Sequence, residues 1–583
     1  MINPFSVKTP ETLTAKDIAT LFIDVFSDFP KVLEFNHTFI HGARGTGKSM
    51  MLRYLEPKVQ LEAGKVTNYA DLDFFAIHLP IKTANYNLAE LDRLKEAPYW
   101  IFAEHFFITL ICNTILVKLR DIAPQETTPE IQNFLNNILE LINWFGETDI
   151  KEINSIIELE KIFSREKVNI KRYLSLISFK QDNENYNGII FDYEDFFIQF
   201  IRSVRDLSFT PNGPIFLMID DADNLSIRMQ KVLNNWVSYR TTNEICLKIS
   251  TQKRYKTWRT NQDILIESPH DFTEIDINAV YTSKQKSSFY ERIEKIVEKR
   301  LEVANINVSP HDFFPIDLLQ KEQLDIIKNK IGEEWDKNIK RVSSRKSDDI
   351  TRYTVSEYMK ELEAKKKSNL YSYAGFDSLI NISSGMIRYF LEPASRMFAE
   401  LESRGESNIK CIPATLQDEV IKKWSEEYIL IDFEKMKNDQ NTRFSIGAID
   451  KVDQLKNLID ALCTFFRVKL LSDDSERRFI SFMLTKQPNS ELKEILDLAV
   501  EWGYLNVSTI SNKEGTGRNI LYTLNRRLAP LFKLDPTGYA AHLSVTPEML
   551  NIALLNPNQF VSERLREVKK ADHQTLVQDT LDF

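Results

Sequence analysis

Cysteine and histidine are sparse in this sequence. The four cysteines, Cys112, Cys246, Cys411 and Cys463, lie far apart, and no pair has the CxxC spacing that a zinc or redox site would use. None of the eight histidines falls in an HExxH or other paired metal-ligand spacing. The pattern therefore gives no support to a zinc or redox centre, and no Ser-His-Asp or nucleophilic Cys arrangement can be recognised.

Long hydrophobic runs, repeats and low-complexity tracts are also missing. The most apolar stretch, Trp100 to Leu119, is interrupted by Glu104, His105 and Lys118, which favours a core helix over a membrane element. The first residues, MINPFSVKTPETLTAKD, lack a basic region followed by an apolar one. We therefore expect a cytoplasmic protein with no membrane partner. Only 16 glycines occur, which fits a helix-rich fold.

The amino-acid composition is that of a globular protein. The 583 residues suggest about three or four domains. Hydrophobic residues make up 43% and charged residues 27%, which excludes a disordered or fibrous chain. The net charge of -9 repels polyanions, so any nucleic-acid binding must use a local basic surface.

The order of predicted elements indicates an α/β fold. Strands are expected at His37 to His41, Asp73 to Leu79, Pro214 to Asp220 and Glu244 to Ser250, and helices between them. This alternation is typical of a parallel sheet. A helix from Thr14 to Phe29, with Thr14 as its N-cap, is expected to precede the first strand.

We divide the chain into four parts. Residues 1–282 form the nucleotide-binding core, within which residues 80–210 are a helical insertion too long for an ordinary crossover. Residues 283–405 are a helical lid with a charged insertion, residues 406–540 a winged-helix domain, and residues 541–583 a C-terminal helical tail.

A glycine-rich loop follows the first predicted strand and opens a helix. The string Gly42-Ala43-Arg44-Gly45-Thr46-Gly47-Lys48-Ser49 fits G-x-x-x-x-G-K-[ST]. Backbone N–H groups of Gly42, Gly45, Thr46 and Gly47 turn around a phosphate in such a loop, Lys48 reaches the β- and γ-phosphates, and Ser49 offers a hydroxyl to Mg²⁺. The loop predicts binding of ATP with Mg²⁺.

The second half of a nucleotide site is an acidic pair at the end of a buried strand. Asp220 and Asp221 follow the apolar run Ile215 to Ile219. Asp220 is expected to hold Mg²⁺ together with Ser49, and Asp221 to polarise the attacking water.

These residues resemble an AAA+ ATPase, most closely the origin-recognition and replication-initiator branch. The resemblance rests on three motifs. The tetrad Asp220-Asp221-Ala222-Asp223 is similar to D-E-hydrophobic-D, and Ile249-Ser250-Thr251 is similar to the I-S-N sensor-1 string. Gly385-Met386-Ile387-Arg388 is similar to the G-[ND]-x-R sensor-2 motif. The resemblance implies that Thr251 stands in the sensor-1 position and that Arg388 touches the γ-phosphate. The string GARGTGKSMMLRYL also resembles bacterial members of this branch that act in conflict systems.

Two features bear on the implied activity. Asp221 stands where the family has a catalytic Glu and is one methylene shorter, which predicts slow hydrolysis. An arginine finger would complete a neighbour's site in a homo-oligomer; Arg259 is the first choice, and Arg254 and Arg240 are rivals.

The C-terminal third predicts a winged helix. Helices are expected at residues 448–466, 475–484 and 490–503, followed by the strands LNVSTI and NILYTL around a glycine-containing turn. Basic residues of this wing are expected to contact DNA phosphates: Lys513, Arg518, Arg526 and Arg527.

The third helix argues against base readout. Glu491, Glu494, Asp497 and Glu501 share the face opposite Ile495, Leu496 and Val500. Two functions therefore stay open. The first is an ATP-dependent switch or assembly ATPase acting near double-stranded DNA, in bacterial antiphage defence. The second is a signalling or scaffold ATPase that binds a protein partner or effector without DNA. A weaker third is a nucleotide-binding module without turnover.

Overall fold

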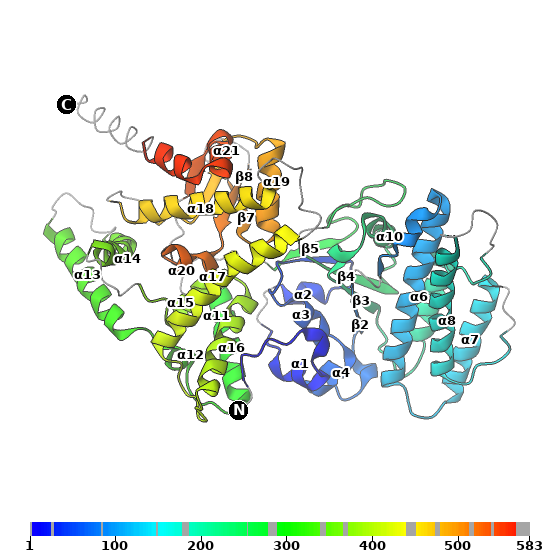
Figure 1. The fold of residues 1–583 in the computed structure, drawn as a ribbon. Coiled ribbons are helices and arrows are strands. Elements are labelled where there is room, and N and C mark those ends of the chain that lie inside the picture. Colours follow the sequence, from blue (N-terminus) through cyan, green and yellow to red (C-terminus); the bar gives the residue numbers. More distant parts are fainter. Residues whose placement is uncertain are drawn as a thin grey trace. The chain divides into compact units, whose positions relative to one another are not determined.

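The computed structural model describes residues 3–24, 28–82, 86–146, 150–177, 186–252, 255–277, 288–337, 346–364, 371–438, 450–472, 478–511, 518–537 and 542–566. The chain forms two compact units, drawn in Figure 1. We call Lys8–Asn278 the core unit, and Met1–Val7 together with Ala279–Phe583 the C-terminal unit. The expected core of residues 1–282 thus differs at its start, because the first seven residues belong to the other unit.

The core unit is built on a five-stranded sheet in which all neighbours are parallel. β3 and β4 are buried along their whole length, as expected for a sheet covered on both faces. This confirms the predicted α/β fold. In spatial order the strands are β2 (Phe75–Pro80), β3 (Ile215–Asp220), β4 (Ile245–Thr251), β1 (Thr38–His41) and β5 (Thr273–Asp276).

Two details of the core unit differ from the sequence prediction. β5 was not predicted, because it is short, carries two acidic residues and buries only one of its four side chains. The first helix, α1 (Ala15–Leu21), ends well before Phe29, although Thr14 caps it as expected in a capping box with Asp17. The other core helices are α2 (Phe29–Val32), α3 (Lys48–Tyr54), α4 (Pro57–Glu62) and α10 (Ile227–Ser238), with short helical turns at η1 (Pro10–Thr12), η2 (Tyr69–Asp71) and η5 (Ala222–Asn224).

The insertion between β2 and β3 is helical, as predicted. Its three long helices, α6, α7 and α8, are grouped in Figure 1, and the hydrophobic core of the sheet continues through them. α6 is long and apolar enough to cross a membrane, but 67% of its most apolar window is buried inside the protein. The insertion consists of η3 (Ala89–Arg93), α6 (Glu96–Ile122), α7 (Pro129–Phe145), α8 (Ile156–Ile177), the π-helix η4 (Tyr193–Phe197) and α9 (Ile198–Arg205).

The C-terminal unit begins with helices and shares one hydrophobic core. Side chains of the expected lid and of the expected winged helix belong to this same core, so the two regions pack as one body. The helices are α11 (Ser288–Val303), α12 (Pro310–Phe313), α13 (Leu318–Lys337), α14 (Lys346–Ala364), α15 (Phe376–Ile382), α16 (Ile387–Ser403), α17 (Ala414–Asn438) and α18 (Lys451–Leu470).

The end of this unit corrects two expectations. Residues 475–484 were predicted as a helix, but Ser481–Leu484 is strand β6, which pairs with β8 on one side and β9 on the other. The tail from residue 541 is not purely helical, because it opens with β9, and residues 567–583 lie outside the described part. The elements here are β6 (Ser481–Leu484), α19 (Ser490–Glu501), β7 (Leu505–Ser511), β8 (Arg518–Leu524), η8 (Arg526–Leu528), α20 (Ala529–Phe532), β9 (His542–Val545) and α21 (Pro547–Leu555).

Candidate nucleotide site

The glycine-rich loop joins β1 to α3 and has the backbone that a phosphate cradle needs. Gly45 and Gly47 have φ values of 92° and 103°, which side-chain-bearing residues rarely adopt. At Gly42 the reason for glycine is space, because a Cβ there would lie 2.7 Å from Cγ1 of Ile277 and 2.9 Å from Oγ1 of Thr46. The loop leads directly to the N-terminus of α3, where free backbone N–H groups favour the binding of an anion.

Lys48 is folded into this loop. Its Nζ donates to the carbonyl oxygens of Gly42 at 2.6 Å and Ala43 at 3.2 Å, and the residue is 5% exposed. Burial lowers the pKa of Lys48, and the nearby Asp221 and Asp220 act in the opposite direction. The ammonium group thus lies inside the loop with carboxylates close by.

Asp220 lies at the carboxyl end of β3 and is 1% exposed. Its Oδ2 lies 3.1 Å from Nε2 of His78, and its Oδ1 accepts from the hydroxyl of Ser250. The Ser49 hydroxyl also contributes to lowering the pKa of this carboxylate. Burial alone would raise the pKa of Asp220, but the contacts with His78 and Ser250, together with the Ser49 hydroxyl, outweigh it and lower the pKa, so the carboxylate is charged.

Asp221 has an unusual backbone that the end of β4 supports. Its φ of 56° and ψ of 47° lie in the left-handed region, which is uncommon for a residue with a side chain. Its N–H donates to Oγ of Ser250 at 2.9 Å. Burial, and then the charge of Asp220, raise the pKa of Asp221. Ser250 therefore joins the two aspartates through one hydroxyl group.

Thr251 and Gln252 point to different partners. Thr251 is 0% exposed, and its Oγ1 lies 2.7 Å from Nδ1 of His41 on β1. Nε2 of Gln252 donates to Oδ1 of Asp221 at 3.3 Å, and its backbone N–H donates to Oδ2 of Asp223 at 2.6 Å. The residue predicted for the sensor position thus contacts β1, while the amide beside the acidic pair belongs to the next residue.

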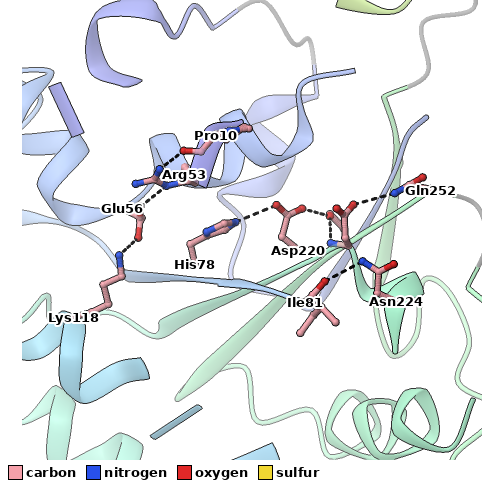
Figure 2. A network of polar contacts seen from close by, with 11 residues as sticks. Pro10, Arg53, Glu56, His78, Ile81, Lys118, Asp220, Asn224 and Gln252 are labelled. Carbon is pink, nitrogen blue, oxygen red and sulfur yellow. Dashed lines mark hydrogen bonds and ion pairs between the residues drawn. The ribbon is translucent and has the colours of Figure 1, made fainter. Parts of the chain in front are cut away.

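A second chain of polar contacts lies beyond His78, around Glu56. Figure 2 shows His78 reaching Asp220 from β2, with Gln252 on the other side of the acidic pair. Behind His78 lies Glu56, which is 5% exposed and pairs with Nε of Arg53 at 3.0 Å and Nζ of Lys118 at 2.5 Å. Lys118 belongs to α6, so this chain connects the insertion with the helix that follows the loop.

The donor set fits a magnesium ion. Ser49 provides a hydroxyl and Asp220 a charged carboxylate, and Mg²⁺ prefers oxygen ligands of this kind, completed by water and substrate phosphates. These two residues would hold the ion, whose charge would stabilise the negative charge on the phosphates.

The candidate arginine fingers have different surroundings. Arg259 is exposed, and its guanidinium donates to the carbonyl oxygen of Asp263 at 2.6 Å. Arg240 is paired with Asp271 at 2.6 Å, and Arg254 lies outside the described residues. Arg388, the second residue of α16, is half-buried and belongs to the C-terminal unit.

The structure corrects the candidate DNA contacts. Arg526 and Arg527 are 4% and 8% exposed and lie in η8 beyond the hairpin, so they are not available to phosphates. Lys513 lies outside the described residues. Arg518 begins β8, and its side chain is not among those described.

The acidic face of α19 is partly used within the unit. Oε1 of Glu491 accepts from Gln454 at 3.0 Å, and Glu494 pairs with Lys451; both partners lie on α18. Ile495 and Leu496 are buried on the opposite face, as predicted. The acidic face therefore helps to hold two helices together.

Three site residues were missed by the sequence analysis: His78, Ser250 and Gln252. Ser250 and Gln252 had a recognisable signal, since they flank Thr251 at the end of a predicted strand and neighbouring parallel strands end at the same edge. His78 had none, because its role depends on which strands are neighbours in space.

A phosphate-binding loop that follows a parallel strand and holds Lys48, with a charged aspartate at the end of β3, defines a P-loop nucleotide-binding protein of the α/β class. The profile of the ORC-CDC6-like family matches residues 3–545. The chain belongs to the ORC-CDC6-like family of AAA+ proteins, which is related to DNA replication initiators and indicates nucleotide binding and ATPase activity.

Two further comparisons with known proteins give less information about this chain. A solved structure described as Drosophila ORC bound to DNA is similar with 11% sequence identity and a TM-score of 0.26, over 90% of this chain and 94% of that chain. No curated protein matches the sequence.

Proposed function

We propose that this protein is an ATP-dependent switch or assembly ATPase that acts near DNA. The observation that carries the proposal is the arrangement of Lys48, Ser49 and Asp220, which places a buried ammonium, a hydroxyl and a charged carboxylate around one phosphate loop. Family membership supports the same activity, because initiator-related AAA+ proteins are nucleotide-binding ATPases.

Slow hydrolysis is part of this proposal. Asp221 would polarise the attacking water, but its side chain is one methylene shorter than that of a glutamate. A long-lived ATP state suits a switch, in which the γ-phosphate holds one conformation and hydrolysis resets it. Arg259 is exposed and would complete the site of a neighbouring copy in a homo-oligomer.

A role in bacterial antiphage defence completes the proposal. Its support is the resemblance of the loop sequence to conflict-system relatives. Genes for a nuclease or another toxic effector next to the coding gene would strengthen this assignment, and a replication operon in their place would contradict it.

Binding of a protein partner in place of DNA is the second candidate. The burial of Arg526 and Arg527 favours it, because it removes two of the four basic residues proposed to contact phosphates. In this version the insertion and the C-terminal unit would hold an effector.

A salt titration separates the two candidates. Binding of a fluorescent duplex is measured by anisotropy with a non-hydrolysable ATP analogue or with ADP, from about 50 mM to about 200 mM salt. The DNA proposal predicts tighter binding in the ATP state, a steep loss of affinity with salt, and a slope reduced by about one for each of K513A and R518A. No binding of duplex at the lowest salt would overturn it in favour of a protein partner.

A further inference from the structure

The end of β4 presents three successive polar side chains with different partners. Because side chains alternate along a strand, Ser250 and Gln252 are directed to one side and Thr251 to the other. The Ser250 hydroxyl contacts both aspartates, and the Gln252 amide donates to the Asp221 carboxylate at 3.3 Å. Asp221 is therefore held at its backbone by one residue of β4 and at its side chain by another.

Thr251 contacts residues outside the acidic pair. Its hydroxyl lies 2.7 Å from Nδ1 of His41, and its carbonyl oxygen accepts from the N–H of Gly42 at 3.0 Å. Its side chain is fully buried. The contacts of Thr251 thus join β4 to the start of the phosphate loop and leave its hydroxyl at His41, away from the acidic pair.

We infer that Gln252, and not Thr251, is the positioning residue that orients the carboxylate of Asp221. This inference rests on the proposed function, since it assigns the residue that aims the water-polarising group of that ATPase. Gln252 acts through Asp221 and is not itself placed on the substrate.

Side-chain lengths support the assignment. Asp221 has one methylene fewer than a glutamate, and Gln252 has one methylene more than an asparagine. The longer amide therefore reaches the shorter acid across the gap between the ends of β3 and β4. Gln252 is also fixed at its backbone, because its N–H donates to Asp223 at 2.6 Å, so its side chain starts from a defined point.

Analogue binding tests the inference without depending on turnover. Affinities of the full chain for ADP–aluminium fluoride, which resembles the transferring phosphoryl group, and for ADP–beryllium fluoride, which resembles the ground state, are measured with Mg²⁺ by calorimetry. We expect Q252A to lower the preference for the aluminium fluoride complex about tenfold while ADP affinity changes less than about twofold. Q199A, which changes an exposed glutamine of the same unit, is the matched control and keeps the parent's preference, and T251V tests the other candidate.

A double-mutant cycle adds a readout that a purely structural role would not move. Q252N shortens the amide and should lower the preference about tenfold in the parent, but less than about twofold when Asp221→Glu restores the missing methylene. Thermal unfolding of each variant checks that the fold is retained.

The outcomes are distinguishable. A parent that binds neither complex contradicts the proposed function itself and the inference with it. A parent that prefers aluminium fluoride, with Q252A preferring it equally or T251V losing the preference, overturns the inference alone. A parent with no preference also overturns it, because no group would then be oriented toward the transferring phosphoryl group.

Discussion

At the scale of residues, the core unit contains buried ionisable groups with defined partners. Lys248 of β4 is 0% exposed, and its Nζ donates to the carbonyl oxygens of Glu34 at 2.6 Å and Asn36 at 2.9 Å. Nearby, Nδ1 of His37 accepts from the N–H of Leu247 at 3.1 Å. Burial, together with the charge of Lys248, lowers the pKa of His37 from 6.5 to about 3. The histidine is therefore neutral in the folded protein.

This neutral histidine predicts how stability depends on pH. Below pH 6.5 the unfolded chain takes up a proton at His37 and the folded chain does not until about pH 3, so acid favours unfolding. Between these values His37 should reduce the free energy of unfolding by about 1.4 kcal/mol per pH unit. H37N retains an acceptor and should lack this contribution. Denaturant unfolding at pH 7, 6 and about 5 measures it, and equal pH slopes for parent and variant would contradict the account.

At the scale of elements, η8 shows why basic residues next to the β7–β8 hairpin need not bind phosphate. The guanidinium of Arg527 lies 3.7 Å from the ring centroid of Trp424 and 4.2 Å from that of Tyr428, and it donates to the Trp424 carbonyl oxygen at 3.0 Å. These contacts join η8 to α17. The arginine is thus a packing residue of the C-terminal unit.

Removing this arginine should cost stability. A desolvated cation–π contact contributes about 2 kcal/mol, and the hydrogen bond adds to it, so R527M should lower the free energy of unfolding by about 2–3 kcal/mol. Lys423 is an exposed residue of the same helix, α17, and the control variant K423M should change the free energy of unfolding by less than about 0.5 kcal/mol. Urea unfolding followed by tryptophan fluorescence compares them. An R527M protein as stable as the parent would show that these contacts contribute nothing.

The sequence predicted elements well where one pattern dominates. The four strands that form the buried part of the core sheet have apolar runs bounded by polar residues, and their positions are confirmed. β5 and β6 were missed because each depends on pairing with distant strands. Short strands of this kind are defined by their neighbours more than by their own residues.

At the scale of the whole molecule, the loop and the acidic pair could be predicted because each is a continuous motif. Of the groups that support Asp220 and Asp221, Ser250 and Gln252 follow a predicted strand and had a signal, whereas His78 had none, because it comes from β2. Arg527 illustrates the same limit, since its charge was visible in the sequence and the aromatic cage from α17 was not. Contacts between distant segments decide these roles.

The measurement that tests the account most directly is calorimetry of ATP with Mg²⁺ on the full chain. The account predicts saturable binding of one nucleotide per chain in the parent and in K65A, which changes an exposed lysine of the same unit. K48A should bind about 100-fold more weakly with its fold intact, because it loses charge-assisted hydrogen bonds of about 1.5–3 kcal/mol. No heat from the folded parent, or equal binding by K48A, would contradict the claim that Lys48, Ser49 and Asp220 form a nucleotide site.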